Sequence, residues 1–202
     1  MTLRLSVGTK NAHKIAELER ILAPELPGLV LTPSSDEAPE ETGLSFSDNA
    51  LIKARSAFEA GAVPSIADDS GIAVSALGGA PGIHSARYAG TGEDADNTAL
   101  LLRNMAHHVD RSAAFVCAAA FVWEGGEVVV ERRWEGSLAM EPAGEGGFGY
   151  DPVFIPAGHA ITAAQMAADA KDQLSHRGQA FRALAVSIRE ALGVNEDSNL
   201  DS

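Results

Sequence analysis

The chain has 202 residues, of which 46% are hydrophobic and 21% charged, an ordinary composition for a globular protein that can bury a substantial core. Acidic residues outnumber basic ones by 28 to 15, and the resulting formal net charge of −13 argues against broad, sequence-independent binding to DNA or RNA. The single cysteine, Cys117, excludes an intramolecular disulfide and a cysteine-based zinc site.

Strand and helix patterns alternate in the first third of the chain. The apolar run Leu3–Val7 is typical of a buried strand, and a helix should follow it because apolar residues recur there at helical spacing: Ile15, Leu18, Ile21 and Leu22. Pro24 and Pro27 should end that helix. The elements expected next are a short strand at 29–31, a polar loop at 33–43, and a helix that begins at Ser45 or Ser47 and runs to about Ala60.

The middle of the chain is richer in β-structure. A strand that begins at Ser65 should end near Ala67, so that Asp68 and Asp69 follow it. The elements expected after this strand are a glycine-rich turn at 77–82, a helix at 97–109, and two strands at 113–123 and 127–134. Gly125 and Gly126 lie between the last two runs, which predicts a β-hairpin.

The last part of the chain predicts a glycine- and proline-rich loop followed by helices. The loop covers 142–156 and contains a short apolar run at 153–155, and the helices are expected at 162–170 and 175–192. We expect one domain over residues 1–194 and a disordered acidic tail over 195–202. Because a hairpin follows the early strand–helix units, the fold class is α/β with a mixed β-sheet flanked by helices.

Three segments carry side chains suited to binding phosphate or metal. The first lies between the first strand and the first helix, where helix N-terminal amides attract phosphate and Lys10, His13 and Lys14 add donors. An ordinary turn capped by Asn11 or Thr9 is the alternative, and the sequence alone leaves both open. The spacing of a phosphate-binding P-loop is absent.

The second segment is acidic. Asp68 and Asp69 follow an expected strand end, where α/β sheets place their ligands, and Mg²⁺ usually uses one or two carboxylates together with substrate phosphates. Glu40 and Glu41, in the earlier loop, are further carboxylates for such a site. The alternatives are that Asp69 and Ser70 only cap a turn and that the glutamates belong to a solvated loop.

The third segment combines a glycine-rich loop with cations near the last helix. Residues 144–149 match Gly-x-Gly-x-x-Gly, but the prolines on both sides exclude the strand and helix of a dinucleotide site. The loop instead predicts a close approach of backbone to ligand, with Phe148 or Tyr150 able to stack on a base. His176 and Arg177 would lie in the first turn of a helix, which disfavours cations unless an anion is also present.

Together these segments resemble the inosine-triphosphate pyrophosphatase family, also called the noncanonical purine nucleoside-triphosphate pyrophosphatases or HAM1-like family, which includes dITP/XTP pyrophosphatases. The resemblance extends from Val7 to about Leu192. The matching stretches are Thr9-x-Asn11-x-x-Lys14, Glu40-Glu41-Thr42-Gly43, Asn49-Ala50-x-x-Lys53-Ala54, Ala67-Asp68-Asp69-Ser70-Gly71, Gly78-Gly79-Ala80-Pro81-Gly82, Ser85-Ala86-Arg87-Tyr88, Gly146-Gly147-Phe148-Gly149-Tyr150-Asp151-Pro152 and Ser175-His176-Arg177-Gly178. The order of these stretches makes the resemblance specific.

The resemblance implies an elongated mixed sheet flanked by helices, in two lobes with an active-site cleft between them, and a homodimer. It implies hydrolysis of dITP, ITP and XTP between the α- and β-phosphates, giving a nucleoside monophosphate and pyrophosphate, with Mg²⁺ as cofactor and the cleansing of the nucleotide pool as the role. The partner is therefore a small nucleotide. With no apolar run long enough for a membrane and no signal-peptide pattern, we expect no membrane partner and a cytoplasmic location.

The resemblance also assigns roles to residues of this chain. Asp69 matches the general base and metal ligand, and Glu41, or the adjacent Glu40, matches the second acidic metal position. The phosphates match Thr9, Lys10, Asn11, Ala12, His13, Lys14 and Lys53, with Lys10 and His13 at variable places. Ser70 lies beside the general base. The nucleobase and sugar match Phe148, Gly149, Tyr150, Asp151, Lys171, His176 and Arg177.

Two other functions compete with this one. A pyrophosphatase for pyrimidine or modified nucleotides, as in the related Maf-like fold, would prefer a pyrimidine triphosphate over dITP. A nucleotide-sensing module without catalytic activity would bind nucleotide but release no pyrophosphate, and the intact acidic pair Asp68 and Asp69 argues against it.

Overall fold

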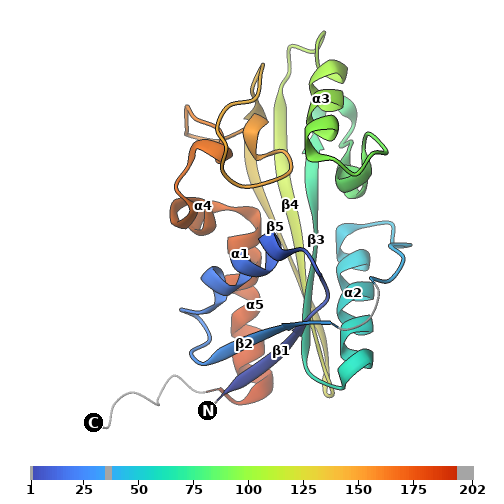
Figure 1. Ribbon diagram of the computed structural model, residues 1–202, viewed down its shortest axis with the longest axis vertical. Helices are drawn as coiled ribbons and strands as arrows, with labels where there is room; N and C mark the ends of the chain where they lie inside the picture. Colours follow the sequence, from blue (N-terminus) through green and yellow to red (C-terminus); the bar gives the residue numbers. More distant parts are fainter. Residues whose placement is uncertain (1, 35–37, 195–202) are drawn as a thin grey trace.

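A single six-stranded sheet runs through the molecule and gives it an elongated shape (Figure 1). The computed structural model describes residues 2–34 and 38–194. Along the sheet, the strand order is β2-β1-β3-β4-β5-β6, with parallel pairing of β1 to β2 and β3 and antiparallel pairing elsewhere. The strands are β1 (Leu3–Val7), β2 (Leu29–Pro33), β3 (Ser65–Val74), β4 (Ser112–Trp123), β5 (Gly126–Leu138) and β6 (Phe154–Pro156). The expected mixed α/β sheet is confirmed.

Five α-helices and four short 3₁₀ helices flank this sheet in the described part of the chain. The α-helices are α1 (Ala12–Leu22), α2 (Phe46–Gly61), α3 (Asp94–Asn104), α4 (Ala168–Leu174) and α5 (His176–Leu192). The 3₁₀ helices are η1 (Ser75–Leu77), η2 (Gly82–Arg87), η3 (Asp151–Val153) and η4 (Ala163–Gln165). Over residues 2–34 and 38–194, we find no helix with the length and apolar character needed to cross a membrane.

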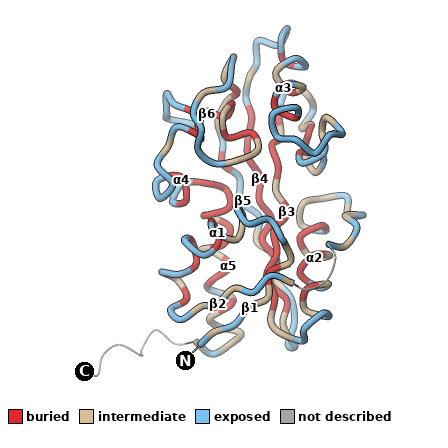
Figure 2. The backbone as a smooth tube through the Cα atoms, in the orientation of Figure 1, coloured by how far each residue is buried: buried red, intermediate tan, exposed pale blue. Residues whose placement is uncertain are grey.

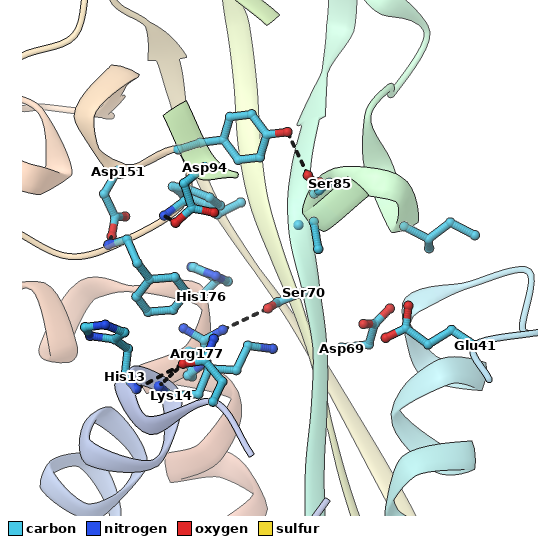
Figure 3. Close-up of a pocket in the computed structure, with 18 of the residues that line it drawn as sticks. His13, Lys14, Glu41, Asp69, Ser70, Ser85, Asp94, Asp151, His176 and Arg177 are labelled. Carbon is cyan, nitrogen blue, oxygen red and sulfur yellow. Dashed lines mark hydrogen bonds between the residues drawn. The ribbon is translucent and has the colours of Figure 1, made fainter. Parts of the chain in front are cut away.

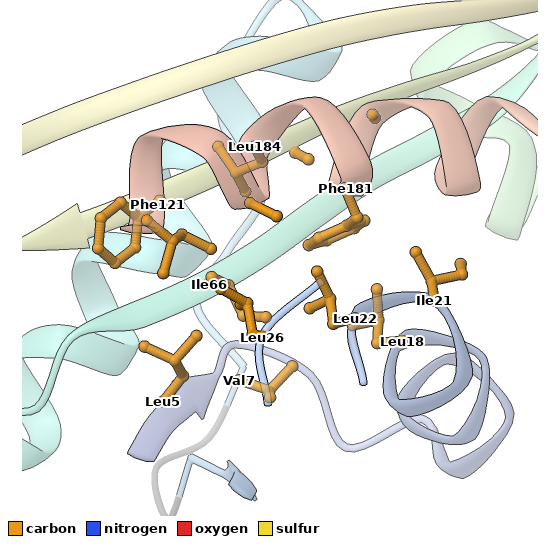
Figure 4. Packing of buried hydrophobic residues seen from close by; sticks show 14 of the residues in the cluster. Leu5, Val7, Leu18, Ile21, Leu22, Leu26, Ile66, Phe121, Phe181 and Leu184 are labelled. Atoms are coloured by element: carbon orange, nitrogen blue, oxygen red, sulfur yellow. The ribbon is translucent and has the colours of Figure 1, made fainter. Parts of the chain in front are cut away.

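Helices α1 and α5 cover one face of the sheet (Figures 1 and 4). The side chains that join them to the strands are fully buried and apolar, among them Leu5, Leu22, Ile66, Phe121 and Phe181. Burying each of these removes its apolar surface from water, worth about 1.5–3 kcal/mol per side chain. This cluster therefore fixes the position of the first turns of α1 and α5 relative to β3.

Helix α2 covers the opposite face through small side chains. Ala50 and Ala54 of the helix pack against Ala67 of β3 and against Ala118 and Ala120 of β4, and all of them are fully buried. Alanine at each contact lets the helix backbone approach the strands closely. Polar residues on the same side of α2 are thereby brought next to β3.

A third apolar cluster closes the far end of the long strands, of which Figure 2 shows β3 and β4 as buried over most of their length. It contains Phe115, Trp134 and Phe154, whose rings are in contact, together with Leu101 of α3 and Tyr150. Because these residues come from α3, from β4, β5 and β6 and from the loop between β5 and β6, the cluster holds that loop against the end of the sheet.

The expected end of the third strand near Ala67 is wrong. β3 continues to Val74, and Asp68 and Asp69 lie inside it, paired with Ala119 and Ala118 of β4. The apolar run that indicated the strand stops at the aspartates, but β4 offers a ladder partner along the whole segment. The pair thus lies within the strand and not at its carboxyl end.

Two helix predictions also differ from the structure. The helix expected at 97–109 is α3, which begins at Asp94 and ends at Asn104, because its first turn carries acidic residues suited to a helix N-terminus. The helix expected at 162–170 is divided into η4 and α4, between which the chain is extended at Met166 and Ala167. The tail at 195–202 lies outside the described residues.

Candidate functional site

The site is built around an open edge of β3. In the described residues, β1 pairs with β3 only at Ser65 and Ile66, so the edge of β3 beyond them faces a cleft. A cavity of about 210 Å³ lies there and is lined by Asn11, His13, Lys14, Glu41, Lys53, Asp69, Ser70, Gly71, Ile83, Ser85, Ala86, Asp94, Phe115, Phe148, Gly149, Tyr150, Asp151, Lys171, His176 and Arg177. Successive side chains of a strand point to opposite faces, so the cavity receives groups from both sides of β3 (Figure 3).

On the side of α1 and α5, Asp68 receives three donors on one oxygen, while its other oxygen, Oδ1, is buried without a hydrogen-bond partner among the described residues. One oxygen, Oδ2, accepts hydrogen bonds from Lys14 Nζ at 3.1 Å, Arg177 Nη2 at 3.1 Å and Ser70 Oγ at 3.0 Å. Burial alone would raise the pKa of Asp68, but the positive charges of Lys14, Arg177 and Lys53 outweigh it and hold the pKa well below its ordinary value. These charges therefore favour the ionised form of Asp68, which anchors two cations.

Arg177 links Asp68 to a longer chain of buried charges. Its Nη1 donates to Glu17 Oε2 at 2.6 Å, Glu17 Oε1 lies 3.6 Å from Lys171 Nζ, and Lys171 Nζ donates to Asp151 Oδ2 at 2.7 Å. These side chains are at most 8% exposed. The anions that the first turn of α5 needs beside Arg177 are thus supplied by the protein itself, as Glu17 and Asp68.

On the side of α2, Asp69 has fewer donors. Lys53 Nζ donates to Asp69 Oδ1 at 2.7 Å, and Asn49 Nδ2 donates to Oδ2 at 3.3 Å. Burial raises the pKa of Asp69, and Lys53 offsets this only in part because Glu41 adds a like charge. The positive charge around Asp69 therefore does not fully offset the cost of burying its carboxylate.

Glu41 completes this side of the cavity. Its Oε1 accepts from Lys53 Nζ at 3.1 Å and its Oε2 from Arg87 Nη1 at 2.8 Å. Burial alone would raise the pKa of Glu41, but Arg87 and Lys53 outweigh it and lower the pKa. Glu40, by contrast, is exposed and is not among the residues that line the cavity. Of the two adjacent glutamates, only Glu41 faces Asp69.

The donor set on this side fits a hard divalent cation. Asp69 and Glu41 converge on one cationic nitrogen, Lys53 Nζ, and burial raises the pKa of Asp69 despite that contact. Residues 2–34 and 38–194 contain no cluster of three or more His, Cys, Asp or Glu that could hold a metal ion. Mg²⁺ does not require one, because it uses one or two carboxylates and completes its shell with water and phosphate oxygens.

The first turn of α1 has the side-chain cap that one of the two expectations described. Asn11 is the N-cap, and its Oδ1 accepts from the backbone N–H groups of His13 at 3.0 Å and Lys14 at 3.2 Å. These two amides are therefore occupied, and side chains remain as the donors that Asn11, His13 and Lys14 present to the cavity. Thr9 and Lys10 line a neighbouring cavity of about 20 Å³ that shares Lys53, and Ala12 lines neither.

Phe148 lies at the other end of the cavity among cations. Lys171 Nζ and Arg177 Cζ are each 5.3 Å from the centroid of its ring, and the ring of His13 lies 6.2 Å away. These contacts place the aromatic ring of the glycine-rich loop beside the first turns of α1 and α5. The structure thereby brings together segments that are far apart in the sequence, as the resemblance implied.

His176 lies beneath the same end of the cavity. Its ring stacks on Phe115 with the centroids 4.7 Å apart and an interplanar angle of 8°. Burial lowers the pKa of His176 well below its ordinary value, and the charges of Arg177 and Lys171 lower it further, so the ring is neutral. Within the described residues, its Nδ1 is buried and has no hydrogen-bond partner.

Several residues of the site were not predicted. Asn49 and Glu17 hold Asp69 and Arg177, Asp94 Oδ2 accepts from Gly149 N at 2.6 Å, and the Ser85 carbonyl accepts from Tyr150 Oη at 2.8 Å. Asn49 and Ser85 stood in the matched motifs, but neither residue type indicated a role there. An aspartate at a helix start, such as Asp94, reads as an ordinary N-terminal residue.

Gly71 explains why η2 can lie against β3. A Cβ atom at Gly71 would be 2.4 Å from Ser85 Oγ and 2.5 Å from the Gly82 carbonyl oxygen, so no other residue fits without moving η2. Ser85 Oγ in turn accepts from Ile72 N at 2.9 Å. The close approach places Arg87, at the end of η2, within reach of Glu41.

The chain matches a sequence model of the Ham1 family over residues 5–187. A dITP/XTP pyrophosphatase of Mycobacterium tuberculosis (strain ATCC 25618 / H37Rv) is 50% identical over 197 residues, which cover 94% of this chain and 97% of that protein.

Two solved structures share the fold. A HAM1 protein from Coxiella burnetii superposes with a TM-score of 0.84 at 38% identity and covers 94% of this chain and 100% of its own. The Staphylococcus aureus Ham1 protein superposes with a TM-score of 0.83 at 35% identity and covers 93% of this chain and 99% of its own.

Proposed function

Because this chain belongs to the Ham1 family, we propose that it is a pyrophosphatase that hydrolyses the noncanonical purine nucleoside triphosphates dITP, ITP and XTP to nucleoside monophosphate and pyrophosphate, which cleanses the nucleotide pool. The observation that carries this proposal is Asp69, a carboxylate of raised pKa that faces Lys53 and Glu41 in the cavity. Relatives named dITP/XTP pyrophosphatase favour this function over a pyrimidine-specific enzyme and over a sensor without activity.

Asp69 and Glu41 are the residues that would hold Mg²⁺. Their oxygens already meet at Lys53 Nζ, within 3.1 Å, so a second cation can be bound between carboxylates and substrate phosphates. When bound, Mg²⁺ would offset the charge that accumulates on the phosphate oxygens. Lys53 supplies part of that compensation in advance and keeps the two carboxylates close together.

Asp69 would accept a proton from the water molecule that attacks the α-phosphorus. Its raised pKa makes it a stronger base than an exposed aspartate, and it lies in the cavity next to the open edge of β3. Lys14 and Lys53 flank this position and would offset the charge of the departing pyrophosphate. Direct attack by water requires no covalent intermediate on the protein.

Selection of the base would take place around Phe148, His176 and Arg177. Hypoxanthine and xanthine carry an oxygen at position 6, where adenine carries an amino group, so a donor aimed at that position favours the former. His176 has a buried nitrogen without a protein partner, as has Arg177 at Nε, within the described residues. A donor left unpaired against adenine costs about 1–3 kcal/mol, enough to discriminate between the bases.

We also propose a cytoplasmic location and a homodimer, the latter on the family resemblance alone. The dimer is tested by light scattering on the purified protein, where a molar mass near 21.0 kDa would contradict it.

The function is tested by measuring pyrophosphate release in Mg²⁺ from ITP, XTP, dITP, GTP, ATP and a pyrimidine triphosphate. We expect turnover of the first three and little of the others, and loss of turnover when EDTA removes the metal. Preference for the pyrimidine nucleotide would favour the Maf-like alternative, whereas nucleotide binding without pyrophosphate release would favour the sensor.

A further inference from the structure

Two carboxylates hold two consecutive amides of the glycine-rich loop. The N–H of Phe148 donates to Asp151 Oδ2 at 2.9 Å, and the N–H of Gly149 donates to Asp94 Oδ2 at 2.6 Å. Asp151 is buried and bound to Lys171, whereas Asp94 is exposed and belongs to another element, α3. The loop is therefore fixed from two directions, and only one of the two carboxylates has been given a role by the resemblance.

Helix α3 binds both backbone polar groups of Gly149, its N–H and its carbonyl. Asp94, in the first turn, accepts from the N–H, and Thr98, one turn later, donates its hydroxyl to the carbonyl at 3.4 Å. Residues four apart lie on the same face of a helix, so the two contacts act on the peptide groups on either side of one residue, Gly149. Gly149 has φ +62°, a left-handed conformation that these contacts help to maintain.

The helix that grips the loop is itself attached to the wall of the cavity. Asn97 Nδ2 donates to the Ala86 carbonyl at 3.2 Å, and Asn97 Oδ1 accepts from Ala89 N at 2.7 Å. Asp94 lines the cavity and lies on the same side of β3 as Asp151 and His176, opposite Asp69 and Glu41 (Figure 3). Its grip is thus at the Phe148 end of the cavity, away from the acidic pair.

Building on the proposed function, we infer that Asp94 is a positioning residue that fixes the Gly149 peptide and thereby holds Phe148 in place for the purine base. Phe148 is the residue next to the gripped peptide, and its ring already lies 5.3 Å from Lys171 Nζ and Arg177 Cζ. Release of Gly149 N–H frees the loop on one side, so affinity for the base falls while the hydrolytic groups stay in place.

Two other roles for Asp94 make different predictions. An aspartate in the first turn stabilises a helix through its dipole, but Asp96 lies in the same turn of α3 and shares that effect. A negative charge at the cavity would repel a triphosphate, so its removal would strengthen binding of any polyanion. Only the positioning role predicts weaker binding of nucleotide after loss of the carboxylate.

The test compares Asp94→Ala with two controls, Asp94→Asn and Asp96→Ala. The first control retains an oxygen that can accept from Gly149 N, and the second removes the same charge from a neighbouring exposed residue that makes no side-chain hydrogen bond or ion pair within the described residues. KM and kcat are measured with dITP, and inorganic tripolyphosphate, which lacks a base, is titrated as an inhibitor.

We expect Asp94→Ala to raise KM for dITP about threefold to tenfold, the equivalent of one exposed hydrogen bond, with kcat changed less than about twofold. Its inhibition by tripolyphosphate should stay unchanged or become slightly stronger. Asp94→Asn should remain within about twofold of the wild type in KM, and Asp96→Ala should match the wild type.

An unchanged KM in Asp94→Ala would overturn the inference, as would an equal rise in KM for Asp96→Ala or an equal loss of tripolyphosphate inhibition. These outcomes are distinct from failure of the proposed function, which would appear as a wild type that releases no pyrophosphate. In that case, calorimetric titration of dITP into the same variants still compares their affinities and decides whether Asp94 holds the loop.

Discussion

The two faces of β3 treat two adjacent aspartates in opposite ways. Asp68 receives Lys14, Arg177 and Ser70 on a single oxygen, and its pKa lies well below the ordinary value. Asp69, the next residue, receives Lys53 and Asn49, and its pKa is raised. Strand geometry alone separates them, because neighbouring side chains project to opposite faces.

The difference shows how one short motif can supply both stability and chemistry. Asp68 lies at the end of a chain of buried charges that connects β3 to α1 and α5. Its hydrogen bonds all go to other side chains of the protein. Asp69 keeps capacity for a further cation and for a proton, which are the properties that a general base and metal ligand need. Substitution of Asp69 should therefore affect mainly turnover, and substitution of Asp68 mainly stability.

The largest effect is expected from Asp69→Asn. Loss of the proposed proton acceptor and metal ligand should lower pyrophosphate release from dITP by about 10²–10⁴-fold. Lys53 loses one partner but keeps Glu41 at 3.1 Å, so the variant should still fold. Near-normal turnover would remove Asp69 from the mechanism, and unfolding of the variant would place it with Asp68.

Asp68→Asn should act on stability instead. The substitution leaves Lys14 and Arg177 without their shared anion, and breaking a buried ion pair in this way costs about 3–5 kcal/mol. Denaturant unfolding of the purified variant measures the loss. Ser70→Ala removes a neutral hydroxyl that donates to the same oxygen and accepts from Arg177 Nη2 at 2.8 Å, and as the matched control it should lose only about 1–2 kcal/mol. Equal losses in the two variants would contradict a special role of the charge.

Glu41→Gln should change the Mg²⁺ dependence of turnover more than it changes the stability of the fold. Removing a carboxylate from the metal position should raise the Mg²⁺ concentration needed for half-maximal turnover by at least about tenfold. Glu40→Gln is the control, since Glu40 is exposed and lies outside the cavity. Turnover is measured across a Mg²⁺ titration for both variants. A larger shift for Glu40→Gln would reverse the assignment.

The smallest effect concerns pH and the Asp68 face. A carboxylate whose folded pKa is depressed contributes stability above its unfolded pKa and loses it as the pH falls towards the folded pKa. The advantage of the wild type over Asp68→Asn should therefore be constant near neutral pH and shrink as the pH falls below the ordinary value of 3.8. Denaturant unfolding at several pH values measures this difference. A difference that persists unchanged in strong acid would contradict the proposed anchoring charge.

Much of the fold followed from local patterns. The bounds of β1, the N-cap of α2 at Ser45, and the hairpin at Gly125 and Gly126 agree with the structure because each rests on residues close in sequence. β3 was cut short because two charged residues interrupt its apolar run, and its true length depends on pairing with β4. Pairing between distant segments is not visible in a local pattern.

The site was foreseen in its residues more than in its contacts. Lys53, Asp69 and Arg177 do line one cavity, but their partners could not be read from spacing, since Glu17 and Arg177 are 160 positions apart. The resemblance also included Glu40 and Ala12, which do not line this cavity, and Thr9 and Lys10, which line its smaller neighbour. The resemblance identified the motifs of the site, but which side-chain atoms contact each other depends on how distant segments pack.

The open edge of β3 has a mechanical consequence. In the described residues, β1 does not pair with β3 beyond Ile66, so it does not connect the charged networks on the two faces of β3. A nucleotide that fills the cavity would contact α2 on one side and α5 on the other, and would hold them together. Pyrophosphate or a nucleoside alone would brace only part of that span. Amide hydrogen exchange would then slow in both α2 and α5 when the whole nucleotide is bound, and in only one of the two helices when pyrophosphate or the nucleoside is bound alone.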